Sequence, residues 1–110
     1  MFRQTTPILV SHNEEETIQF YTGRMGFTFR ESHAGYLIFS RDGIYVHLWP
    51  CTEPEVRNVG CYIYVTHIDG LYREYTEAGI VHSNGPLELK PWGLRQFATV
   101  DNSGNIFYFA

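Results

Sequence analysis

The chain has 110 residues, of which 44% are hydrophobic and 16% aromatic, and it carries a formal net charge of −4. This length suits one domain, or two small halves that share one core. The negative charge disfavours nucleic acid and anionic membranes as partners, and it is compatible with a cationic small molecule. Residues 1–16 contain no long apolar run, so we expect no signal peptide, no membrane span and a cytoplasmic location. Cys51 and Cys61 have no CxxC spacing and are expected to be reduced thiols.

Two helices are predicted, each after a short apolar strand. The first lies within residues 11–27, SHNEEETIQFYTGRMGF, with Ser11 or Asn13 as its N-terminal cap. The second lies within residues 67–80, HIDGLYREYTEAGI, with Asp69 as its cap. The strands TPILV and CYIYV precede them, so the order strand, helix, further strands occurs twice. The faces expected to be buried carry Ile18, Tyr21 and Met25 in the first helix, and Ile68, Leu71, Tyr72 and Tyr75 in the second.

The Asp42-Gly43 pair lies between two alternating runs, GYLIFSR and IYVHLW, and this predicts a two-residue β-hairpin. A two-residue turn fixes the register, so that Ile38 opposes His47 and opposed residues share one face of the sheet. The aromatic face, which we expect to meet a ligand, carries Tyr36, Ile38, Tyr45, His47 and Trp49. The apolar face, which we expect a helix to cover, carries Leu37, Phe39, Ile44, Val46 and Leu48.

The second half is predicted to begin after a linker at residues 50–58, PCTEPEVRN. In CYIYV the alternation points Tyr62 and Tyr64 to the open face of the sheet. Residues 83–93, SNGPLELKPWG, are predicted to be mostly loop with a short edge strand. The chain ends in a DNSGN turn and an IFYF strand, in which Tyr108 faces away from the core. The residues expected to face the helix or the core are Cys61, Ile63, Val65, Phe107 and Phe109.

Four segments together resemble the vicinal-oxygen-chelate superfamily, which includes glyoxalase I, extradiol dioxygenases, and the fosfomycin and bleomycin resistance proteins. The segments are IQFYTGRMGF, SRDGIYVHLWP, CYIYVTHIDGLYREYTEAGI and PWGLRQFATVDNSGN, and they cover most of the chain. Within the superfamily the chain is most similar to the bleomycin resistance family, because of the Trp-Gly pair before the last strands. One departure is Asn102, where the usual turn has proline.

This resemblance implies an α+β fold, in which two βαβββ modules form a curved mixed sheet around a ligand cleft and the chain pairs as a homodimer. A single domain would span residues 1–110, with module one at about 1–50, the linker at about 50–58 and module two at about 59–110. The resemblance also implies that each groove of the homodimer is completed by the other subunit, often with exchange of a strand or a half.

The enzymes of the superfamily hold a divalent metal, and the resemblance places the ligand positions at Thr6, Gly60 and Tyr108, with a fourth near His47. Such a metal needs imidazole or carboxylate ligands, which threonine, glycine and tyrosine do not supply. We therefore expect no metal, no cofactor and no catalytic residue. Tyr108 is expected to face the cavity where the enzymes have a metal-ligating glutamate. The sequence also contains no GxSxG, Walker-type, Rossmann or HExxH motif.

The resemblance and the aromatic pattern together predict a bleomycin-resistance-like binding protein that is not an enzyme. It would sequester a cationic aromatic small molecule, of the glycopeptide antibiotic type, in an aromatic groove without metal. Its partners would be this small-molecule ligand and a second copy of the chain, with neither nucleic acid nor membrane. The predicted ligand-binding residues are Tyr36, Ile38, Tyr45, His47, Trp49, Tyr62, Tyr64, Trp92 and Tyr108.

Two other functions stay open from the sequence. One is a glyoxalase-like metal-dependent lyase or isomerase with displaced ligands, in which His47 is joined by a second histidine or by an acid such as Glu88. The other is an orphan scaffold that binds an ordinary metabolite or a protein partner. The aromatic residues also have two interpretations, a ligand cavity or a second aromatic core, and His47 is either a ligand contact or a hydrogen-bonded cavity histidine.

Overall fold

Residues 1–110 are all described by the computed structural model, which shows an α+β chain of two helices and eight strands. The first half contains β1 (Ile8–Ser11), α1 (Glu14–Gly23), β2 (Thr28–His33), β3 (Tyr36–Arg41) and β4 (Ile44–Pro50). The second half contains β5 (Gly60–Ile63), α2 (Ile68–Glu77), β6 (Glu88–Leu89), β7 (Arg95–Val100) and β8 (Ile106–Phe109). Each half is therefore a βαβββ module, as predicted.

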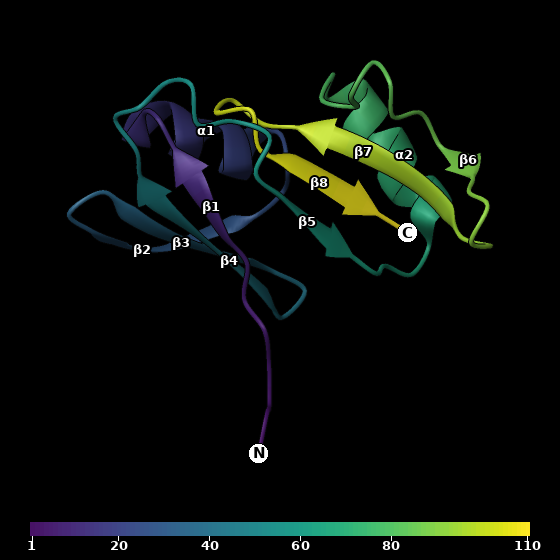
Figure 1. Cartoon of the computed structure of the whole chain (residues 1–110), viewed down its shortest axis with the longest axis horizontal. Coiled ribbons are helices and arrows are strands. Elements are labelled where there is room, and N and C mark those ends of the chain that lie inside the picture. Colours follow the sequence, from purple (N-terminus) through teal and green to yellow (C-terminus); the bar gives the residue numbers. More distant parts are fainter.

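The two modules have the same sheet topology. Sheet one has the strand order β1-β4-β3-β2, and sheet two has the order β5-β8-β7-β6. In each sheet the first strand runs parallel to the last strand of its module, and the remaining pairs are antiparallel. Figure 1 shows sheet one with α1 on the left and sheet two with α2 on the right. Each module thus builds its own four-stranded mixed sheet.

The β3–β4 hairpin has the predicted turn and register. Asp42 and Gly43 have φ angles of 52° and 78°, the left-handed backbone that this kind of two-residue turn requires. Ile38 pairs with His47, as predicted. The face expected to be buried is buried at every position except Ile44, which is 45% exposed. Ile44 directly follows the turn and lines a cavity between the modules, so the prediction that it is buried was wrong.

The predicted N-terminal cap is correct for α1 and wrong for α2. Asn13 caps α1 by accepting a 2.9 Å hydrogen bond from a backbone N–H of the first turn, whereas Ser11, the other candidate, lies in β1. α2 begins after His67, whose backbone is left-handed and whose side chain makes no capping bond. The prediction that Asp69 caps α2 was wrong. Asp69 lies inside the first turn, where its carboxylate accepts hydrogen bonds from Arg95 of β7.

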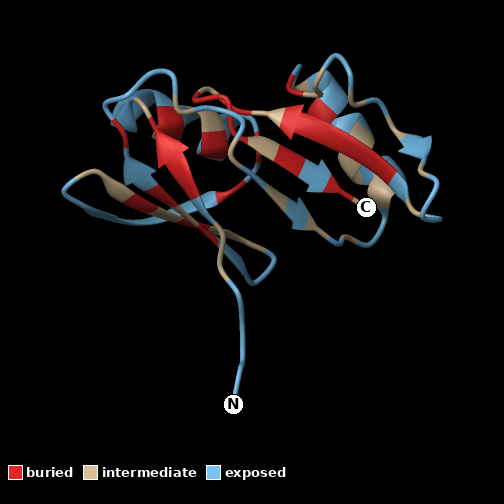
Figure 2. Cartoon of the chain, in the orientation of Figure 1, coloured by how far each residue is buried: buried red, intermediate tan, exposed pale blue.

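A single hydrophobic core joins the two modules. Tyr21 of α1 stacks on Phe39 of β3 with ring centroids 4.8 Å apart, and its ring meets Phe107 of β8 edge-on at 6.1 Å. Phe107 belongs to module two, so aromatic contacts cross between the sheets. Figure 2 shows buried positions running through both modules. The core consists of Leu9, Tyr21, Met25, Phe27, Leu37, Phe39, Val46, Leu48, Tyr75, Ile80, Phe97, Phe107 and Phe109.

Each helix also contains a tyrosine whose hydroxyl donates a hydrogen bond to the other module. Tyr21 of α1 donates to the carboxylate of Asp101, at 2.5 Å, in the turn before β8. Tyr75 of α2 donates to the carbonyl oxygen of Met25, at 2.7 Å, in the loop after α1. Both tyrosines are buried, and these bonds satisfy hydroxyl groups that would otherwise destabilise the core. Each module therefore donates one buried hydrogen bond that stabilises its packing against the other module.

The DNSGN turn before β8 joins module two to β1 of module one through hydrogen bonds. The Asn105 side chain pairs with the Val10 backbone as a strand would, accepting from its N–H at 3.1 Å and donating to its carbonyl at 2.7 Å. Asp101 holds the turn itself, because its carboxylate accepts from the backbone N–H groups of Ser103 and Asn105. Asp101 and Asn105 are both buried, so this turn is a joint between the modules.

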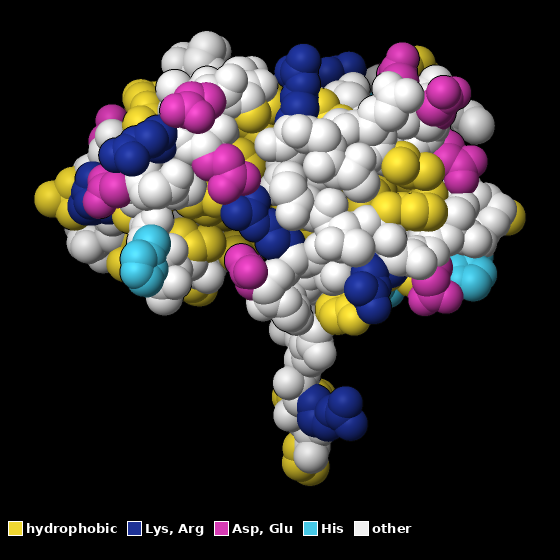
Figure 3. Space-filling model, turned by 180° about the vertical axis from the view of Figure 1, so that it is seen from behind, with side chains coloured by type: hydrophobic (Ala, Val, Ile, Leu, Met, Phe, Trp, Pro, Cys, Tyr) yellow, Lys and Arg dark blue, Asp and Glu magenta, His cyan; other side chains and the backbone are white.

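Residues 1–7 form an extended arm before β1. The arm points away from both modules (Figure 1) and is exposed over most of its length (Figure 2). Hydrophobic and basic side chains lie along it when the molecule is seen from behind (Figure 3), and Phe2 is fully exposed. Thr6, expected on the first strand, lies in this arm instead, because β1 begins only at Ile8.

Two further expectations concern the cysteines and the membrane. Cys51 and Cys61 are both free, as predicted; Cys51 is buried and Cys61 is half-buried. Neither helix has the length and apolar character that a membrane-spanning helix requires.

Candidate functional site

Most of the residues predicted to bind a ligand lie on the open faces of the two sheets, and two of them, Tyr64 and Trp92, lie in loops. The module-one group is Tyr36, Ile38, Tyr45, His47 and Trp49, on β3 and β4. The module-two group is Tyr62 on β5, Tyr108 on β8, Tyr64 in the loop after β5 and Trp92 in the loop between β6 and β7. Tyr45, Trp49 and all members of the module-two group are between 36% and 75% exposed. These residues form accessible aromatic surface and not a second aromatic core.

The module-two group forms a connected aromatic platform. The rings of Tyr62 and Tyr108 stack with centroids 6.3 Å apart and planes 18° apart, and the ring of Tyr64 lies 5.3 Å from that of Tyr62. The Trp92 indole N–H donates to the Tyr62 hydroxyl at 3.5 Å, and that hydroxyl donates to Oε1 of Gln96 at 2.7 Å. This chain of hydrogen bonds holds Trp92 beside the tyrosines. Gln96 is not among the residues predicted to bind a ligand, although the alternation of RQFATV places it on the open face.

In the module-one group, Tyr36 and His47 form a hydrogen-bonded pair. The Tyr36 hydroxyl lies 3.0 Å from Nδ1 of His47, and the two rings meet edge-on with centroids 5.5 Å apart. Both side chains are half-buried, whereas Tyr45 and Trp49 beside them are exposed. His47 is therefore a hydrogen-bonded histidine of the open face, and its contact with a ligand stays a prediction.

Within one chain the two groups are not connected. No aromatic pair and no hydrogen bond joins a residue of the module-one group to one of the module-two group. The helix-covered sides of both sheets meet in the shared core, so each sheet presents its own open face. A groove that uses both groups therefore needs a second chain, or a ligand long enough to reach both.

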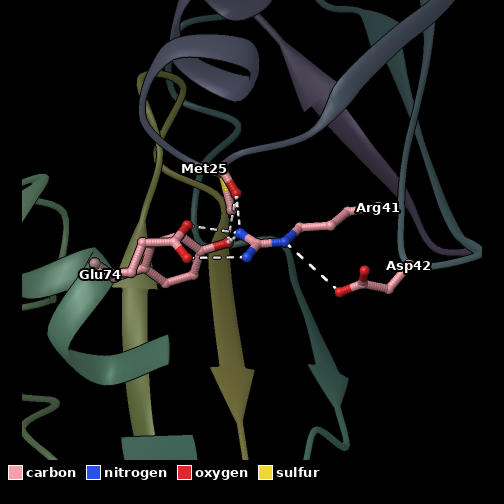
Figure 4. A network of polar contacts seen from close by, with 5 residues as sticks. Met25, Arg41, Asp42 and Glu74 are labelled. Carbon is pink, nitrogen blue, oxygen red and sulfur yellow. Dashed lines mark hydrogen bonds and ion pairs between the residues drawn. The ribbon is translucent and has the colours of Figure 1, made fainter. Parts of the chain in front are cut away.

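A cavity of about 480 Å³ lies elsewhere, between the β3–β4 hairpin and the start of α2. Of the predicted residues only Tyr64 lines it. Its polar wall is a two-pronged ion pair, in which Nη1 and Nη2 of Arg41 donate to the Glu74 carboxylate at 2.7 and 2.9 Å (Figure 4). Arg41 also donates to the Met25 carbonyl at 2.8 Å. The hydrogen bonds between Arg41 and Glu74 lower the pKa of the glutamate and raise the pKa of the guanidinium. Arg41 and Glu74 therefore neutralise each other, and neither charge is left unpaired to bind a ligand.

The positions that correspond to metal ligands in the related enzymes do not form a set of donors. Gly60 cannot carry a ligand, because a Cβ there would lie 2.7 Å from the Ile106 carbonyl oxygen on the paired strand. His47 and Tyr108 lie in different modules. Glu88, the acid considered beside His47, is bonded to a lysine of its own module at 2.6 Å. No group of three or more His, Cys, Asp or Glu side chains that could hold a metal ion is present. The residues present therefore do not fit the metal that the related enzymes hold.

The comparisons with known sequences identify relatives of the chain. No family model matches it. The chain is 29% identical to a bleomycin resistance protein of Geobacillus stearothermophilus, over an alignment of 124 residues that covers 96% of this chain and 94% of the relative. A bleomycin resistance protein of Staphylococcus aureus is similar to the same extent.

The comparisons with solved structures show the fold. A bleomycin resistance determinant encoded on the transposon Tn5 has a TM-score of 0.86 at 25% identity, covering 98% of this chain and 96% of that one. A bleomycin-binding protein complexed with bleomycin has a TM-score of 0.83 at 25% identity, covering 98% and 97%. A bleomycin-binding protein from Streptomyces verticillus, complexed with copper(II)-bleomycin, has a TM-score of 0.87 at 24% identity, covering 100% and 96%. The chain thus has the fold of the vicinal-oxygen-chelate superfamily. Its relatives within that superfamily are bleomycin resistance proteins, as the sequence resemblance implied.

Proposed function

We propose that the chain is a binding protein of the bleomycin resistance type, which sequesters a cationic aromatic glycopeptide drug in an aromatic groove. The observation that carries this proposal is the exposure of large aromatic side chains, above all in the aromatic platform of the module-two group. Exposed aromatic surface of this kind is typical of a site that a partner covers. The relatives named bleomycin resistance protein, and the related structures that hold bleomycin, support the bleomycin class as that partner.

Stacking would supply the affinity. The nearly parallel rings of Tyr62 and Tyr108, with Trp92 held beside them, offer flat aromatic surface. Planar groups stack on such rings and cations bind over them, at roughly 0.5–2 kcal/mol for each contact. The net charge of −4 favours a cationic ligand over an anionic one. Binding of this kind makes and breaks no covalent bond, so the proposal includes no catalytic residue, no metal and no cofactor.

The proposal also includes a homodimer, in which the module-one group of one chain faces the module-two group of the other. Three observations support it. The two groups are not connected within a chain, so a groove built from one chain would use only one of them. β5 is an edge strand of its sheet, and its outward backbone groups can meet a second chain, whereas the outer edge of β1 is already bonded to Asn105. The arm at residues 1–7, with Phe2 exposed, reaches beyond its own module and is the segment suited to exchange.

The chain would act as a single domain, with module one at about residues 1–50 and module two at about 59–110, because both modules contribute to one core. A cytoplasmic location forms part of the proposal and is supported by the two free thiols.

The test is a titration of purified protein, first assayed for bound metal, with metal-free and with copper-loaded bleomycin. Tryptophan fluorescence and calorimetry follow the binding. We expect saturable quenching with about one drug molecule per subunit, since a symmetric dimer has two equal grooves. Trp49→Phe and Trp92→Phe should each remove part of the quenching, because each removes the tryptophan of one group.

Two results would contradict the proposal. A protein that binds neither form of the drug has no bleomycin groove, and a metabolite or a protein partner becomes the ligand to seek. A protein that binds no drug but carries stoichiometric zinc, iron or nickel would direct the search to an enzyme of the glyoxalase type.

A further inference from the structure

A smaller cavity of about 180 Å³ lies on the open side of sheet two, beside Tyr108. Its outer wall is the loop that begins at His82, which three backbone hydrogen bonds of 2.8–2.9 Å pin to Ala98 of β7 and to itself. Gly85 completes this wall, and a Cβ there would lie only 2.7 Å from the Ala98 side chain. The wall is held by backbone bonds and by a close approach that needs glycine, so the cavity is preformed and is not a gap beneath a loose loop.

Five side chains that line this cavity carry hydrogen-bond donors, namely His82, Asn84, Lys90, Gln96 and Tyr108, and hydrogen bonds orient three of them. Gln96 is buried, and its Oε1 accepts from Tyr62, so its amide N–H₂ group is the end without a partner. His82 accepts a backbone N–H at Nδ1, so the neutral imidazole carries its proton on Nε2 as a donor. Lys90 uses one N–H on Glu88 and keeps others. No acidic side chain lines the cavity.

From this donor set we infer that the cavity is a subsite for a hydrogen-bond acceptor of the ligand, the oxygen of a carboxamide or a carboxylate group. The inference rests on the proposed function and deepens it, since it names the part of the ligand that this cavity takes. The volume of about 180 Å³ equals roughly six water molecules at about 30 Å³ each, so it holds one side group and not a whole drug.

The subsite and the aromatic platform are physically connected through Tyr62. Its ring belongs to the platform, and its hydroxyl fixes the direction of the Gln96 amide. A planar group stacked on the platform and an acceptor group in the cavity would therefore be held in a defined relative position. The cavity favours an acceptor over a cation, because its lining carries no carboxylate and its one charged side chain, Lys90, is an ammonium paired with Glu88 outside the lining. The two parts of the site thus select opposite ends of one ligand, a flat or cationic end and an acceptor end.

The first test is Gln96→Glu, compared with Gln19→Glu on the exposed surface of α1. Gln96→Glu keeps an oxygen for the Tyr62 hydroxyl but replaces the donor by a second oxygen. We expect it to weaken bleomycin binding roughly tenfold or more, because an acceptor of the ligand then faces an acceptor of the protein. The control makes the same chemical change far from the cavity and should leave affinity within about twofold of the wild type. Thermal unfolding of both variants shows whether the fold is kept.

A second test does not depend on the drug. Isotope-labelled protein is titrated with acetamide, with acetate and with tetramethylammonium, and the side-chain amide resonance of Gln96 is followed by NMR. We expect a saturable shift with acetamide or acetate and none with tetramethylammonium. A response to acetamide alone identifies a carboxamide subsite, and a response to acetate alone identifies a carboxylate subsite.

The outcomes separate this inference from the function on which it rests. Unchanged bleomycin affinity in Gln96→Glu overturns the subsite and leaves the proposed function in place, as does a Gln96 amide that responds to neither acetamide nor acetate. A wild type that does not bind bleomycin, but whose Gln96 amide responds to acetamide or acetate, overturns the proposed function and supports the subsite.

Discussion

The two sides of each sheet differ in what their aromatic residues do. On the helix-covered sides, aromatic rings from both modules meet in one core, and the buried hydroxyls of Tyr21 and Tyr75 are paired across the module boundary. On the open sides, the tyrosines and tryptophans are exposed except for the half-buried Tyr36, and their contacts with one another stay within their own module. Aromatic content alone therefore does not distinguish core from site. The face of the strand on which an aromatic residue lies decides whether it belongs to the core or to the accessible surface.

Substitutions on the two sides of a sheet should therefore have different consequences. Changes on the helix-covered sides should lower the free energy of unfolding. Changes on the open sides should weaken ligand binding and leave the fold intact.

The largest effect is expected from Asp101→Ala, in the joint between the modules. The substitution removes the acceptor for Tyr21, for two backbone N–H groups and for the Asn105 side chain. Because these donors are buried, we expect a loss of at least about 3 kcal/mol in the free energy of unfolding. Urea unfolding followed by circular dichroism measures it. Asp69→Ala, which removes an exposed partner of Arg95, should cost far less, and equal losses in the two variants would show that the joint is not the stronger contact.

The next effect is expected on the open side, from Trp92→Ala. Loss of an exposed aromatic surface at the centre of a site should weaken drug binding by roughly 1–3 kcal/mol. The melting temperature should stay that of the wild type, because the side chain is 61% exposed. Leu89→Ala is the matched control, since Leu89 is an exposed apolar residue outside the predicted site. Unchanged affinity would remove Trp92 from the site, and a large loss of stability would assign it to the core.

A third prediction concerns alkaline pH. Burial raises the pKa of Tyr75 from 10.0 to about 12, and burial and then Asp101 raise the pKa of Tyr21. A raised pKa in the folded state stabilises the fold below the unfolded pKa, and this stabilisation is lost as pH rises through the folded pKa. We therefore expect the free energy of unfolding to fall between about pH 10 and 12, by roughly 1–3 kcal/mol from Tyr75.

Tyr75→Phe is the variant that checks this prediction. It should be less stable than the wild type at neutral pH, but its stability should fall less steeply over the alkaline range. Urea unfolding at a series of pH values gives both curves. Parallel curves for the wild type and the variant would show that Tyr75 does not contribute to the alkaline loss.

The smallest effect is expected from Glu74, at the edge of the core. The hydrogen bonds from Arg41 lower its pKa below 4.5, so its contribution is present above that pH and is lost as pH falls through the folded pKa. Because the pair is partly exposed and screened, we expect less than about 1 kcal/mol. Glu74→Gln should reduce the acid dependence of stability, and high salt should do so in the wild type. An acid dependence that is the same in wild type and variant would rule out this contribution.

Much of the fold follows from local patterns in the sequence. The Asp42-Gly43 turn predicted the register at Ile38 and His47, and helical spacing predicted the buried faces that carry Tyr21 and Tyr75. The same alternation predicted which tyrosines would be accessible. These features depend on neighbours in the chain, so a single sequence reveals them.

The contacts that join the modules could not be predicted in this way. Tyr21 and Asp101 are 80 positions apart, and Val10 and Asn105 are 95 apart, so no local pattern links them. The cavity beside Tyr108 was missed for the same reason, because it depends on the close approach of Gly85 to Ala98. Asp69 satisfied a local rule for helix caps, but in the structure its carboxylate bonds to Arg95 of another element.

The central claim is that one groove joins module one of a chain to module two of its partner, and mixing two variants tests it directly. Equal amounts of Trp49→Ala and Trp92→Ala protein are mixed, allowed to exchange subunits, and titrated with bleomycin. If the groove crosses the dimer, each mixed dimer has one undamaged groove, and about a quarter of all grooves should regain wild-type affinity through random pairing. If each groove belongs to a single chain, every groove keeps one damaged group, and a mixture that regains no wild-type affinity would contradict the claim.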